Sequence, residues 1–322
     1  MSGTVTSRLG ASSKRHSQVA TESPWVRRLL IAIAALFLGI ALLLPLSVVF
    51  ASAFSKGLEP FFAALTQPET ISAIELTLLT AGIAVPLNAV FGMAAAWLVS
   101  RYDFWGKSAL ITLIDLPFSV SPVISGLIFV LLFGAQGVFG SFLSAHDLKI
   151  IFAVPGIVIA TTFVTFPLVA REVLAVMQAQ GSDEEEAALT LGASGFRIFT
   201  RITLPKIRWG ALYGLILCNA RAMGEFGAVS VVSGHIRGQT NTLPLHVEIL
   251  YNEYNFVGAF AVAALLASLA LVTLFVKKGI ELSSALKARR LTRRVEEARL
   301  SLLPASHSAS TARSSAEQRS LA

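Results

Sequence analysis

The segment "SDEEEAALTLGASGFRIFTRITLP", residues 182–205, predicts two short helices joined by a turn. Ser182, the acidic residues after it and "AALTL" are typical of an N-capped helix with negative charge at its positive end. Gly192 can end that helix in a left-handed conformation. "GFRIFTRI" starts a second, amphipathic helix, and Pro205 marks its junction with the apolar stretch that follows. Such a pair of helices between two apolar stretches has little reason to exist for the fold alone, so we interpret it as a docking element.

The composition is that of a membrane protein. Of the 322 residues, 54% are hydrophobic and only 14% are charged, whereas a soluble domain averages about a quarter charged residues. Apolar segments of roughly 20 residues, which is the length that crosses the hydrocarbon core of a bilayer, occur at 29–54, 73–99, 109–134, 150–170, 209–232 and 256–276. The sequence therefore predicts an all-α polytopic membrane protein with six transmembrane helices. The first of these is an anchor, because its apolar core is too long for a signal peptide.

The distribution of lysine and arginine predicts the orientation in the membrane. With the N-terminus in the cytoplasm, 22 of the 26 basic residues fall in cytoplasmic segments, and three, Lys56, Lys149 and Arg237, fall outside. Such a bias is a strong positive-inside signal, and it places both termini in the cytoplasm. It also explains the high pI without any binding to nucleic acid.

The chain is expected to divide into four parts. They are a cytoplasmic N-terminal tail (1–28), the first transmembrane helix (29–54), a core of five helices (71–276) with a long cytoplasmic coupling loop (171–206), and a basic tail (277–322). We expect the basic tail to be disordered, although "LKARRLTRRVEEARL" (286–300) also fits a basic helix at the membrane surface. The outside loop 233–255 mixes apolar and polar residues, and we expect it to fold against the membrane surface.

The sequence contains no motif for catalysis or metal binding. The stretch "WGKS" (105–108) resembles the end of a phosphate loop, but the pattern G-x-x-x-x-G-K-[ST] requires glycine where this chain has Arg101. The single cysteine, Cys218, offers neither a disulfide framework nor a cysteine-rich metal site. We therefore expect no enzymatic activity, metal or cofactor in this chain, and any ATP that it uses is bound by another chain.

The third apolar segment is expected to be broken. In "DLPFSVSPVISGL" (115–127), Pro117 and Pro122 each remove a backbone donor and clash with the preceding turn. Broken backbone at membrane depth is tolerated only where protein or a water-filled cavity surrounds it. Two interpretations remain open. The break is either a kink needed only for packing or, as we favour, a flexible wall of a translocation pathway that includes Ser121.

The fifth apolar segment contains two full charges in "NARAMGEFGAV" (219–229). They are four residues apart, so they can pair along a helix, which lowers the cost of placing each in lipid. At about 100° per residue, Arg221 and Glu225 share a narrow stripe with Gly210, Gly214 and Ala228. The pair either fixes the register of the helix or, as we favour, lies with Gly224 on a substrate pathway that faces a partner subunit, where Arg221 attracts an anion.

The 182–205 segment also carries a family motif. The pattern EAA-x3-G-x9-I-x-L-P is matched by Glu186, Ala187, Ala188, Gly192, Ile202, Leu204 and Pro205. In this respect the chain resembles the permease subunits of binding-protein-dependent ABC importers. "DLPFSVSPV", "FVTFPLVARE", "ARAMGEFGAVSVVSG" and "LPLHVEILYNEYN" make it similar to the sulfate/thiosulfate permeases, and to their CysW type, from about residue 29 to 278.

The resemblance implies a type I ABC importer (MetI-like) permease fold, in which these motif residues couple to a groove on an ATPase. It further implies the partners. These are a second permease subunit of the CysT/CysU type, two ATP-binding subunits that hold the ATP and magnesium, and a periplasmic sulfate-binding protein, all at a bacterial inner membrane. The expected function is ATP-driven import of sulfate and thiosulfate. A molybdate or tungstate importer is the alternative, while the long cytoplasmic loop and the lack of an inverted repeat disfavour an ion-coupled secondary transporter.

Overall fold

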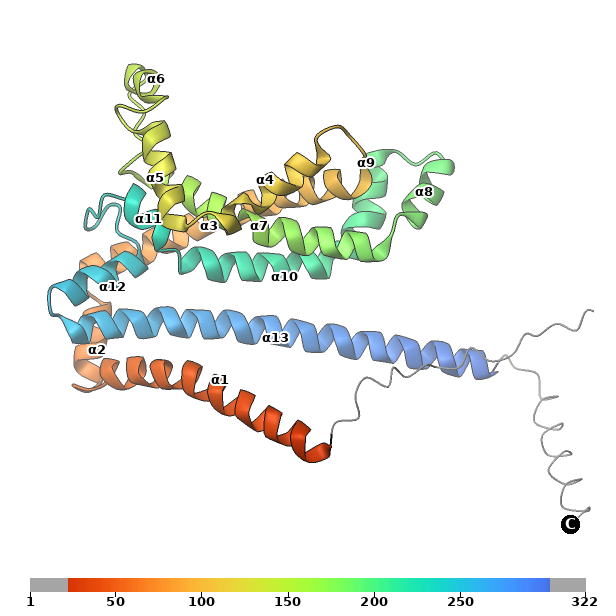
Figure 1. Ribbon diagram of the computed structural model, residues 1–322, viewed down its shortest axis with the longest axis horizontal. Helices are drawn as coiled ribbons and strands as arrows, with labels where there is room; N and C mark the ends of the chain where they lie inside the picture. The colour runs from red at the N-terminus through yellow and green to blue at the C-terminus, as the bar shows by residue number, and fades with distance from the viewer. Residues whose placement is uncertain (1–22, 302–322) are drawn as a thin grey trace, which may run out of the picture. The chain divides into compact units, whose positions relative to one another are not determined.

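The computed structural model describes residues 23–301, and Figure 1 labels the helices of this range. Within this range all regular secondary structure is helical. The elements are α1 (Pro24–Ala53), α2 (Leu58–Leu65), α3 (Pro68–Arg101), α4 (Lys107–Ser119), α5 (Pro122–Phe133), α6 (Gly140–Ala145), α7 (Val154–Gln180), α8 (Asp183–Thr190), α9 (Gly195–Ile198), the π-helix η1 (Phe199–Thr203), α10 (Leu204–Met223), α11 (Gly227–Val232), α12 (Leu243–Asn252) and α13 (Phe256–Ser301).

The chain divides into two compact units, Met1–Ala51 and Ser52–Ala322. The first unit contains α1 as far as Ala51. This helix is 30 residues long and includes Pro45. At 1.5 Å per residue it is long enough to cross a bilayer, in agreement with the predicted anchor. The second unit contains all the other helices.

Four helices of the described range are long and apolar enough to cross a membrane: α1, α3, α7 and the Phe256–Ile280 part of α13. Together, α4 and α5 form a fifth candidate span, which is bent by 110° where they meet. α10 is not among the candidates, because its 20 residues include three cations. The predicted all-helical, multi-pass architecture is therefore confirmed, whereas the count of six transmembrane helices is not.

The fifth predicted span, 209–232, is not one helix. α10 ends at Met223, and α11 begins at Gly227. Glycine is a poor helix former, and Gly224 lies directly after α10. A Glu225 carboxylate oxygen then accepts the N–H of Ala228 at 3.0 Å and so caps the start of the next helix. Arg221 therefore lies in the last turn of one helix, and Glu225 lies just before the first turn of another.

Three helices, α3, α7 and α10, lie side by side and form the core of the second unit (Figure 1). Glycine allows α10 to approach α7 closely. A Cβ atom on Gly210 would lie 2.5 Å from Cγ2 of Val176, and one on Gly214 would lie 3.2 Å from Cα of Val169. The predicted stripe of small residues thus faces a helix of the same chain, and its assignment to a partner subunit is wrong.

A polar contact joins the same three helices. Asn88 of α3 donates from Nδ2 to Thr165 Oγ1 of α7 at 2.7 Å and to Cys218 Sγ of α10 at 3.5 Å. All three side chains are buried. Between transmembrane helices, where burial of apolar surface gives no advantage over lipid, such hydrogen bonds help to hold the bundle together.

The segment 233–255 forms α12, which packs against α3 and α13. Its expected position against the membrane surface stays a prediction. The buried residues of α12 are Leu243, Leu245, His246 and Leu250. Leu245 packs in one buried cluster, with Ile157 and Val229, whereas Leu243 and Leu250 pack in another, so α12 is buried on two sides.

The buried histidine of α12 has a polar environment. Thr70 Oγ1 lies 3.0 Å from Nε2 of His246, and Asn241 Nδ2 lies 3.4 Å from its Nδ1. Burial lowers the pKa of His246, and the nearby Glu69 carboxylate opposes this effect only partly. The ring is therefore neutral in the folded protein at neutral pH.

The final helix, α13, runs without a break from Phe256 to Ser301. The tail predicted to be disordered from residue 277 is thus helical to Ser301, as the alternative of a basic helix suggested. Its location at the membrane surface stays a prediction. Residues 1–22 and 302–322, which make up most of the first tail and the end of the second, lie outside the described residues.

Candidate functional site

The break between α4 and α5 lies where the two prolines predicted it. α4 contains Pro117 and ends at Ser119, and α5 begins at Pro122. The residues between them, Val120 and Ser121, have extended backbone angles. Proline at the first position of α5 needs no backbone donor, because that N–H has no partner within the helix. The predicted break is therefore confirmed, and it bends the pair by 110°.

The start of α11 packs closely against this break. A Cβ atom on Gly227 would lie 2.9 Å from Cβ of Pro122, and one on Gly126 would lie 2.7 Å from the carbonyl oxygen of Ala228. Neither position accommodates a side chain without movement, so glycine at both allows α5 and α11 to meet. The two broken segments, α4–α5 and α10–α11, thus contact one another directly.

Arg221 and Glu225 form an ion pair across the break between α10 and α11. Nη1 of Arg221 lies 2.7 Å from Oε2 of Glu225. The predicted pairing is confirmed, but the two residues do not lie along one helix, as the stripe assumed. The carboxylate is almost fully buried, with 1% of its side chain exposed, whereas the arginine side chain is 43% exposed. The Glu225 carboxylate is therefore enclosed by the protein, whereas the Arg221 side chain extends from it toward the surface.

Arg221 lines a cavity of about 310 Å³. The other lining residues come from the broken helix pair and from α7, and they are Pro117, Phe118, Val120, Pro122, Val164 and Leu168. Arg221 carries the only charge among these lining residues. The helix break predicted from the sequence, between α4 and α5, and the break that only the structure reveals, between α10 and α11, thus meet around one cation in an otherwise apolar cavity.

A second cation lies close to this cavity but is already paired. Arg171 of α7 lies 2.6 Å from the Asp115 carboxylate through Nε, and its guanidinium lies 5.3 Å from the ring centroid of Phe118. Because Phe118 lines the cavity, Arg171 stacks on one of its walls. The positive charge that faces the cavity itself is that of Arg221.

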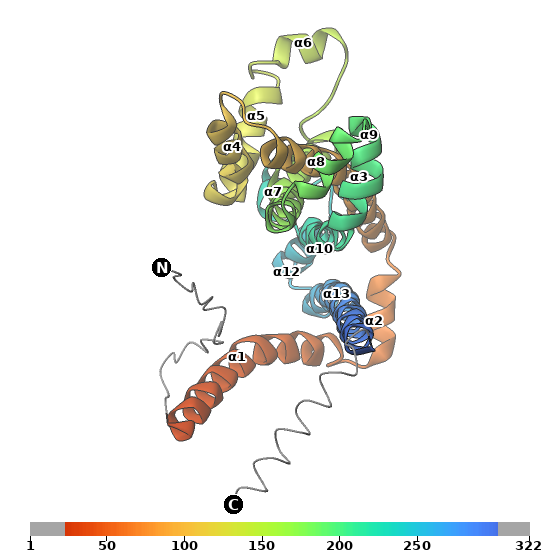
Figure 2. The same ribbon diagram turned by 90° about the vertical axis from the view of Figure 1, so that its right-hand side faces the viewer.

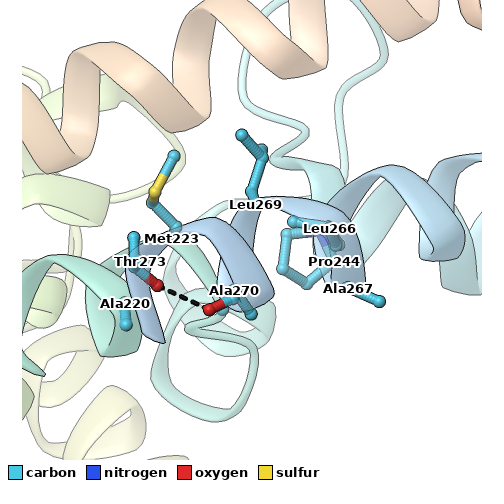
Figure 3. A pocket seen from close by; sticks show the side chains of 9 residues that line it. Ala220, Met223, Pro244, Leu266, Ala267, Leu269, Ala270 and Thr273 are labelled. Carbon is cyan, nitrogen blue, oxygen red and sulfur yellow. Dashed lines mark hydrogen bonds between the residues drawn. The ribbon is translucent and has the colours of Figure 1, made fainter. Parts of the chain in front are cut away.

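Two predicted pathway residues lie elsewhere. Gly224 lines a different cavity of about 300 Å³ between α10, α12 and α13, shown in Figure 3. Met223, Pro244 and Leu266 contribute to its mostly apolar lining, and the Thr273 hydroxyl donates to the Ala270 carbonyl of its own helix at 2.7 Å. Ser121 is exposed at the α4–α5 break, and its carbonyl accepts a hydrogen bond from a side chain of α5. Neither residue lines the Arg221 cavity.

The predicted docking element lies at the other end of the second unit. Figure 1 shows α8 and α9 far along α7 and α10 from α11 and α12. The helix α8 ends as predicted, because Gly192 has a φ of +81°. The N–H of Gly192 donates to the Leu189 carbonyl, and the N–H of Ala193 donates to the Ala188 carbonyl, which together form a Schellman motif.

The other end of α8 differs from the prediction. Ser182 makes no side-chain hydrogen bond to the backbone of the helix. Its hydroxyl donates instead to the carboxylate of Glu186. Four acidic residues occupy the first turn of α8. Their negative charge interacts favourably with the positive end of the helix dipole. Ser182 therefore occupies the N-cap position as predicted but does not cap the helix through its side chain, while the expected negative charge at this end is present.

The second short helix continues into the core. α9, η1 and α10 follow one another without an interruption, and Pro205 is the second residue of α10. The turn between α9 and α10 is π-helical, and this type of turn often occurs at functional sites. Because α7 continues to Gln180, the segment between the long helices is 181–203 and not 171–206. Ile202 lies in η1, and Leu204 is the first residue of α10.

The exposed side chains of this segment are either apolar or small. Leu189, Leu191 and Phe196 have 64%, 88% and 79% of their surface exposed. Ala187 and Ala188 lie on the same helix, in front of the Schellman turn. Exposed large apolar side chains grouped together mark an interaction site.

Comparisons with known proteins identify the family. A family model described as "Binding-protein-dependent transport system inner membrane component" matches residues 88–281. The chain belongs to this family. Its relatives include the sulfate transport system permease protein CysW of Escherichia coli K12, 52% identical over 257 residues, which cover 80% of this chain and 88% of that protein.

Other members of the family support the same assignment. The CysW protein of Synechocystis is 54% identical over 80% of this chain and 93% of its own length. The CysT permease of Salmonella typhimurium is 35% identical over 74% of this chain and 87% of its own length. A permease chain in the crystal structure of a bacterial alginate ABC transporter has the same fold, with a TM-score of 0.67 and 19% identity over 79% of this chain and 92% of that one. This inner membrane component is thus a multi-pass transport permease, as the EAA motif indicated.

One part of this permease was missed by sequence reasoning. From the sequence, Arg101 served only to exclude a phosphate loop, and Glu185 was one of several acidic residues at the start of a predicted helix. The structure brings the two together at 2.6 Å. The sequence did offer a hint of this pair. An arginine stands at the end of one apolar helix, and a run of acidic residues begins a helix that was predicted on the same side of the membrane. The pairing between two segments 84 residues apart depends on the tertiary fold, which no local pattern specifies.

Proposed function

We propose that this permease carries sulfate, and also thiosulfate, through the membrane as one subunit of an ATP-driven importer. The observation that carries the proposal is the meeting of two broken helices around Arg221, in a cavity that is otherwise apolar. Sulfate is favoured as the anion because relatives named as sulfate permeases are 52% and 54% identical over four-fifths of the chain.

Arg221 is suited to attract an oxyanion in transit. Arg221 is the single cation among apolar lining residues, so an anion that enters the cavity gains a charge-assisted hydrogen bond. The guanidinium presents planar donors that match tetrahedral oxyanions. The pair with Glu225 compensates part of the positive charge, so the anion is attracted without being held tightly. A transport pathway requires such a balance, because release must follow binding.

Glu225 contributes by positioning. One of its oxygens accepts the N–H of Ala228, and the other lies against Arg221. It therefore connects the end of α10 to the start of α11 and fixes the side of α10 from which the arginine extends. In this proposal the carboxylate orients the cation, and the cation contacts the substrate.

The surface of α8 and of the turn after it serves as the docking site for an ATPase subunit. Exposed Leu189, Leu191 and Phe196 supply apolar area, while Ala187 and Ala188 allow close approach because their side chains are small. Glu186 lies in the first turn, in reach of a groove that receives the helix. ATP and magnesium are bound by that subunit, and this chain itself binds no cofactor.

The complete importer contains further chains. A homologous second permease of the CysT type, two ATP-binding subunits and a periplasmic sulfate-binding protein assemble with this chain in the inner membrane, with both termini in the cytoplasm. The charge bias of the sequence and the family support this assignment.

The experiment that tests the proposal is uptake by vesicles that contain the permease with its partner chains. Uptake of radiolabelled sulfate should require ATP and the binding protein, and unlabelled thiosulfate should compete with it. Uptake that molybdate or tungstate suppresses more strongly than sulfate does would assign the alternative oxyanion. Uptake that an ion gradient drives without ATP would contradict the proposal as a whole.

A further inference from the structure

We propose that Arg101 and Glu185 form the link through which movement of the docking helix α8 reaches the transmembrane core. This inference rests on the proposed docking of an ATPase subunit at α8. The two residues are positioning residues, because neither touches substrate. Their role is to make α8 move together with α3, α7 and α10.

Apolar burial does not hold α8 in place. None of the eight residues of this helix is buried. Burial of apolar side chains, which ordinarily fixes a helix to its neighbours, is therefore missing here. The helix is held by its two chain connections and by polar contacts. A force applied to α8 reaches the core only through these.

The strongest of the polar contacts is a two-pronged ion pair. Arg101 Nε lies 2.6 Å from Glu185 Oε2, and Arg101 Nη2 lies 3.0 Å from Oε1. Only 13% of the arginine side chain and 11% of the glutamate side chain are exposed. A bidentate arginine–carboxylate pair fixes orientation as well as distance, and low exposure protects it from screening by salt. Such a contact transmits a rotation and not only a pull.

Arg101 also binds the end of a second core helix. It is the last residue of α3, and its Nη2 donates to the carbonyl of Gly181 at 2.9 Å. Nη1 lies 3.5 Å from the carbonyl oxygen of Met177 in α7. The guanidinium thus lies where the negative ends of α3 and α7 meet, and this position favours a cation. One side chain ties α8 to two helices of the core.

Glu185 reaches the third core helix through Thr203. The Thr203 hydroxyl donates to Glu185 Oε1 at 2.8 Å, and Thr203 is 1% exposed. Thr203 is the last residue of η1, directly before α10. Figure 2, in which this end of the molecule faces the viewer, shows α8 and α9 beside the ends of α3 and α7. A single carboxylate therefore connects the docking helix to every helix of the central trio.

The neighbouring residue supplies a matched control. Glu184 lies in the same turn of α8 and pairs with Lys206 of α10 at 2.8 Å. The Glu184 side chain is 67% exposed, so its ion pair is screened by water and contributes little. Glu184→Gln and Glu185→Gln remove the same charge from adjacent positions of one helix. Any difference between the two variants reports the contacts of Glu185 and not the charge of α8.

The first test compares these variants in vesicles that contain the assembled importer. The readout is the amount of sulfate imported per ATP hydrolysed, which a loss of assembly alone does not change. For Glu185→Gln we expect this ratio to fall by about two- to thirtyfold, the range of measured coupling energies, while ATP hydrolysis continues. For Glu184→Gln we expect a ratio within about twofold of the unmodified protein, because exposed pairs contribute little. Equal ratios for the two variants would overturn the inference.

Two further variants separate geometry from charge. Arg101→Lys keeps the cation but removes the planar fork, so its ratio should lie between those of Glu185→Gln and the unmodified importer. Thr203→Val removes only the hydroxyl and leaves both charges, which covers the case in which Glu185→Gln fails to assemble. It should lower the ratio at least about twofold. A ratio equal to that of the unmodified importer in both variants would contradict the link.

The last measurement is independent of the substrate, so the failure of the proposed function can be told apart from failure of this inference. In the purified complex without sulfate, backbone amides of 183–190 should exchange with deuterium faster in Glu185→Gln than in Glu184→Gln. If the unmodified importer takes up no sulfate, the proposed function is wrong, and the exchange rates still decide the role of the link. Equal exchange in the two variants would reject it.

Discussion

The carboxylate of Glu225 lies between the guanidinium of Arg221 at the end of α10 and the backbone N–H of Ala228 at the start of α11, at 2.7 Å and 3.0 Å. One residue thus serves as the counterion of a half-exposed cation and as the cap of a six-residue helix. These two roles predict different results for substitutions that remove the charge and substitutions that also remove the acceptor.

Replacement of Glu225 by glutamine should leave the permease folded, because the amide oxygen still accepts the N–H of Ala228. Replacement by leucine removes that acceptor, and loss of a cap costs about 0.5–2 kcal/mol. We expect Glu225→Leu to lower the yield of assembled complex and its melting temperature, and Glu225→Gln to change both much less. The comparison is made by size-exclusion chromatography and thermal unfolding in detergent. Equal losses in both variants would show that the charge alone determines the stability.

Loss of the Arg221 charge should slow transport. A hydrogen bond to a charged group contributes about 1.5–3 kcal/mol, and 1.4 kcal/mol is a factor of ten. We therefore expect Arg221→Met to lower sulfate uptake per assembled complex by roughly tenfold or more. The control is Arg237→Met, which removes a cation from an ion pair whose arginine and glutamate side chains are 38% and 49% exposed, and this variant should take up sulfate normally.

The double replacement of Arg221 by Met and Glu225 by Gln distinguishes a role of Arg221 in the transport pathway from a purely structural role of the ion pair. It removes the pair together, and it keeps the acceptor for Ala228, so assembly should be retained. If Arg221 attracts the passing anion, uptake by this variant should stay as low as for Arg221→Met. Near-normal uptake would refute the pathway role and leave the ion pair as a structural element.

Gly192→Val should uncouple the importer. Gly192 has a φ of +81°, and a Cβ atom there would meet nothing within 4 Å. The cost is therefore conformational and not steric crowding from neighbours, and a left-handed residue with a side chain costs about 1–2 kcal/mol. We expect the complex to assemble while the binding protein with sulfate no longer stimulates ATP hydrolysis. Gly195→Val is the control, because Gly195 also has open space around it but no positive φ. Normal stimulation in Gly192→Val would contradict the docking role of this turn.

The orientation in the membrane can be tested with single cysteines. Asn241, although on the segment predicted to lie outside, is only 3% exposed and is a poor position for a probe. Gln239→Cys lies in the exposed part of that segment, and Ser194→Cys lies between α8 and α9. An impermeant thiol reagent added to whole cells should label Gln239→Cys and not Ser194→Cys, and the native Cys218 is buried and should stay silent. The reverse pattern would overturn the orientation.

Acidification should destabilise the end of the permease that contains α12 through His246. Its folded pKa is lowered by burial, so the unfolded state binds the proton more tightly. The stability that results is present above the unfolded pKa of about 6.5 and is lost as the pH falls through the folded pKa, with a limiting slope of about 1.4 kcal/mol per pH unit. His246→Gln should flatten the fall in melting temperature between about pH 6.5 and 5. His235→Gln, at an exposed histidine, should leave the fall unchanged, and a curve of wild-type shape for His246→Gln would rule out this residue as the cause.

Local physical rules explain which parts of the fold were predictable from the sequence. Pro122 is the first residue of α5, a position where its missing N–H costs nothing, and Gly192 adopts a positive φ because it lacks a Cβ. Both features were therefore predicted correctly. The pairing of Arg221 with Glu225 also follows from their separation in the chain, since residues four apart come close in a helix and remain close when the second lies just beyond it.

The features that were missed depend on tertiary contacts. The break after Met223 arises because Glu225 caps α11, which itself packs on Gly126 of α5. The burial of α12 on two sides depends on the helices around it, which the spacing of its apolar residues does not specify. Arg101 and Glu185 are 84 positions apart, so their contact exists only once α3, α7 and α8 have assembled.

The π-helical turn η1 determines the direction in which the docking helix faces. A π-turn contains one residue more than an α-turn would in the same place, and each residue of an α-helix advances the chain by about 100° and 1.5 Å. Removal of one residue between Phe199 and Thr203 would let the segment relax to an ordinary α-helix. The short helices α8 and α9 before it would then turn by roughly a quarter of a revolution about the axis of α10, and the proposed ATPase subunit would meet a different side of α8. The direction of the docking surface relative to the substrate cavity is thus encoded in the length of a single turn.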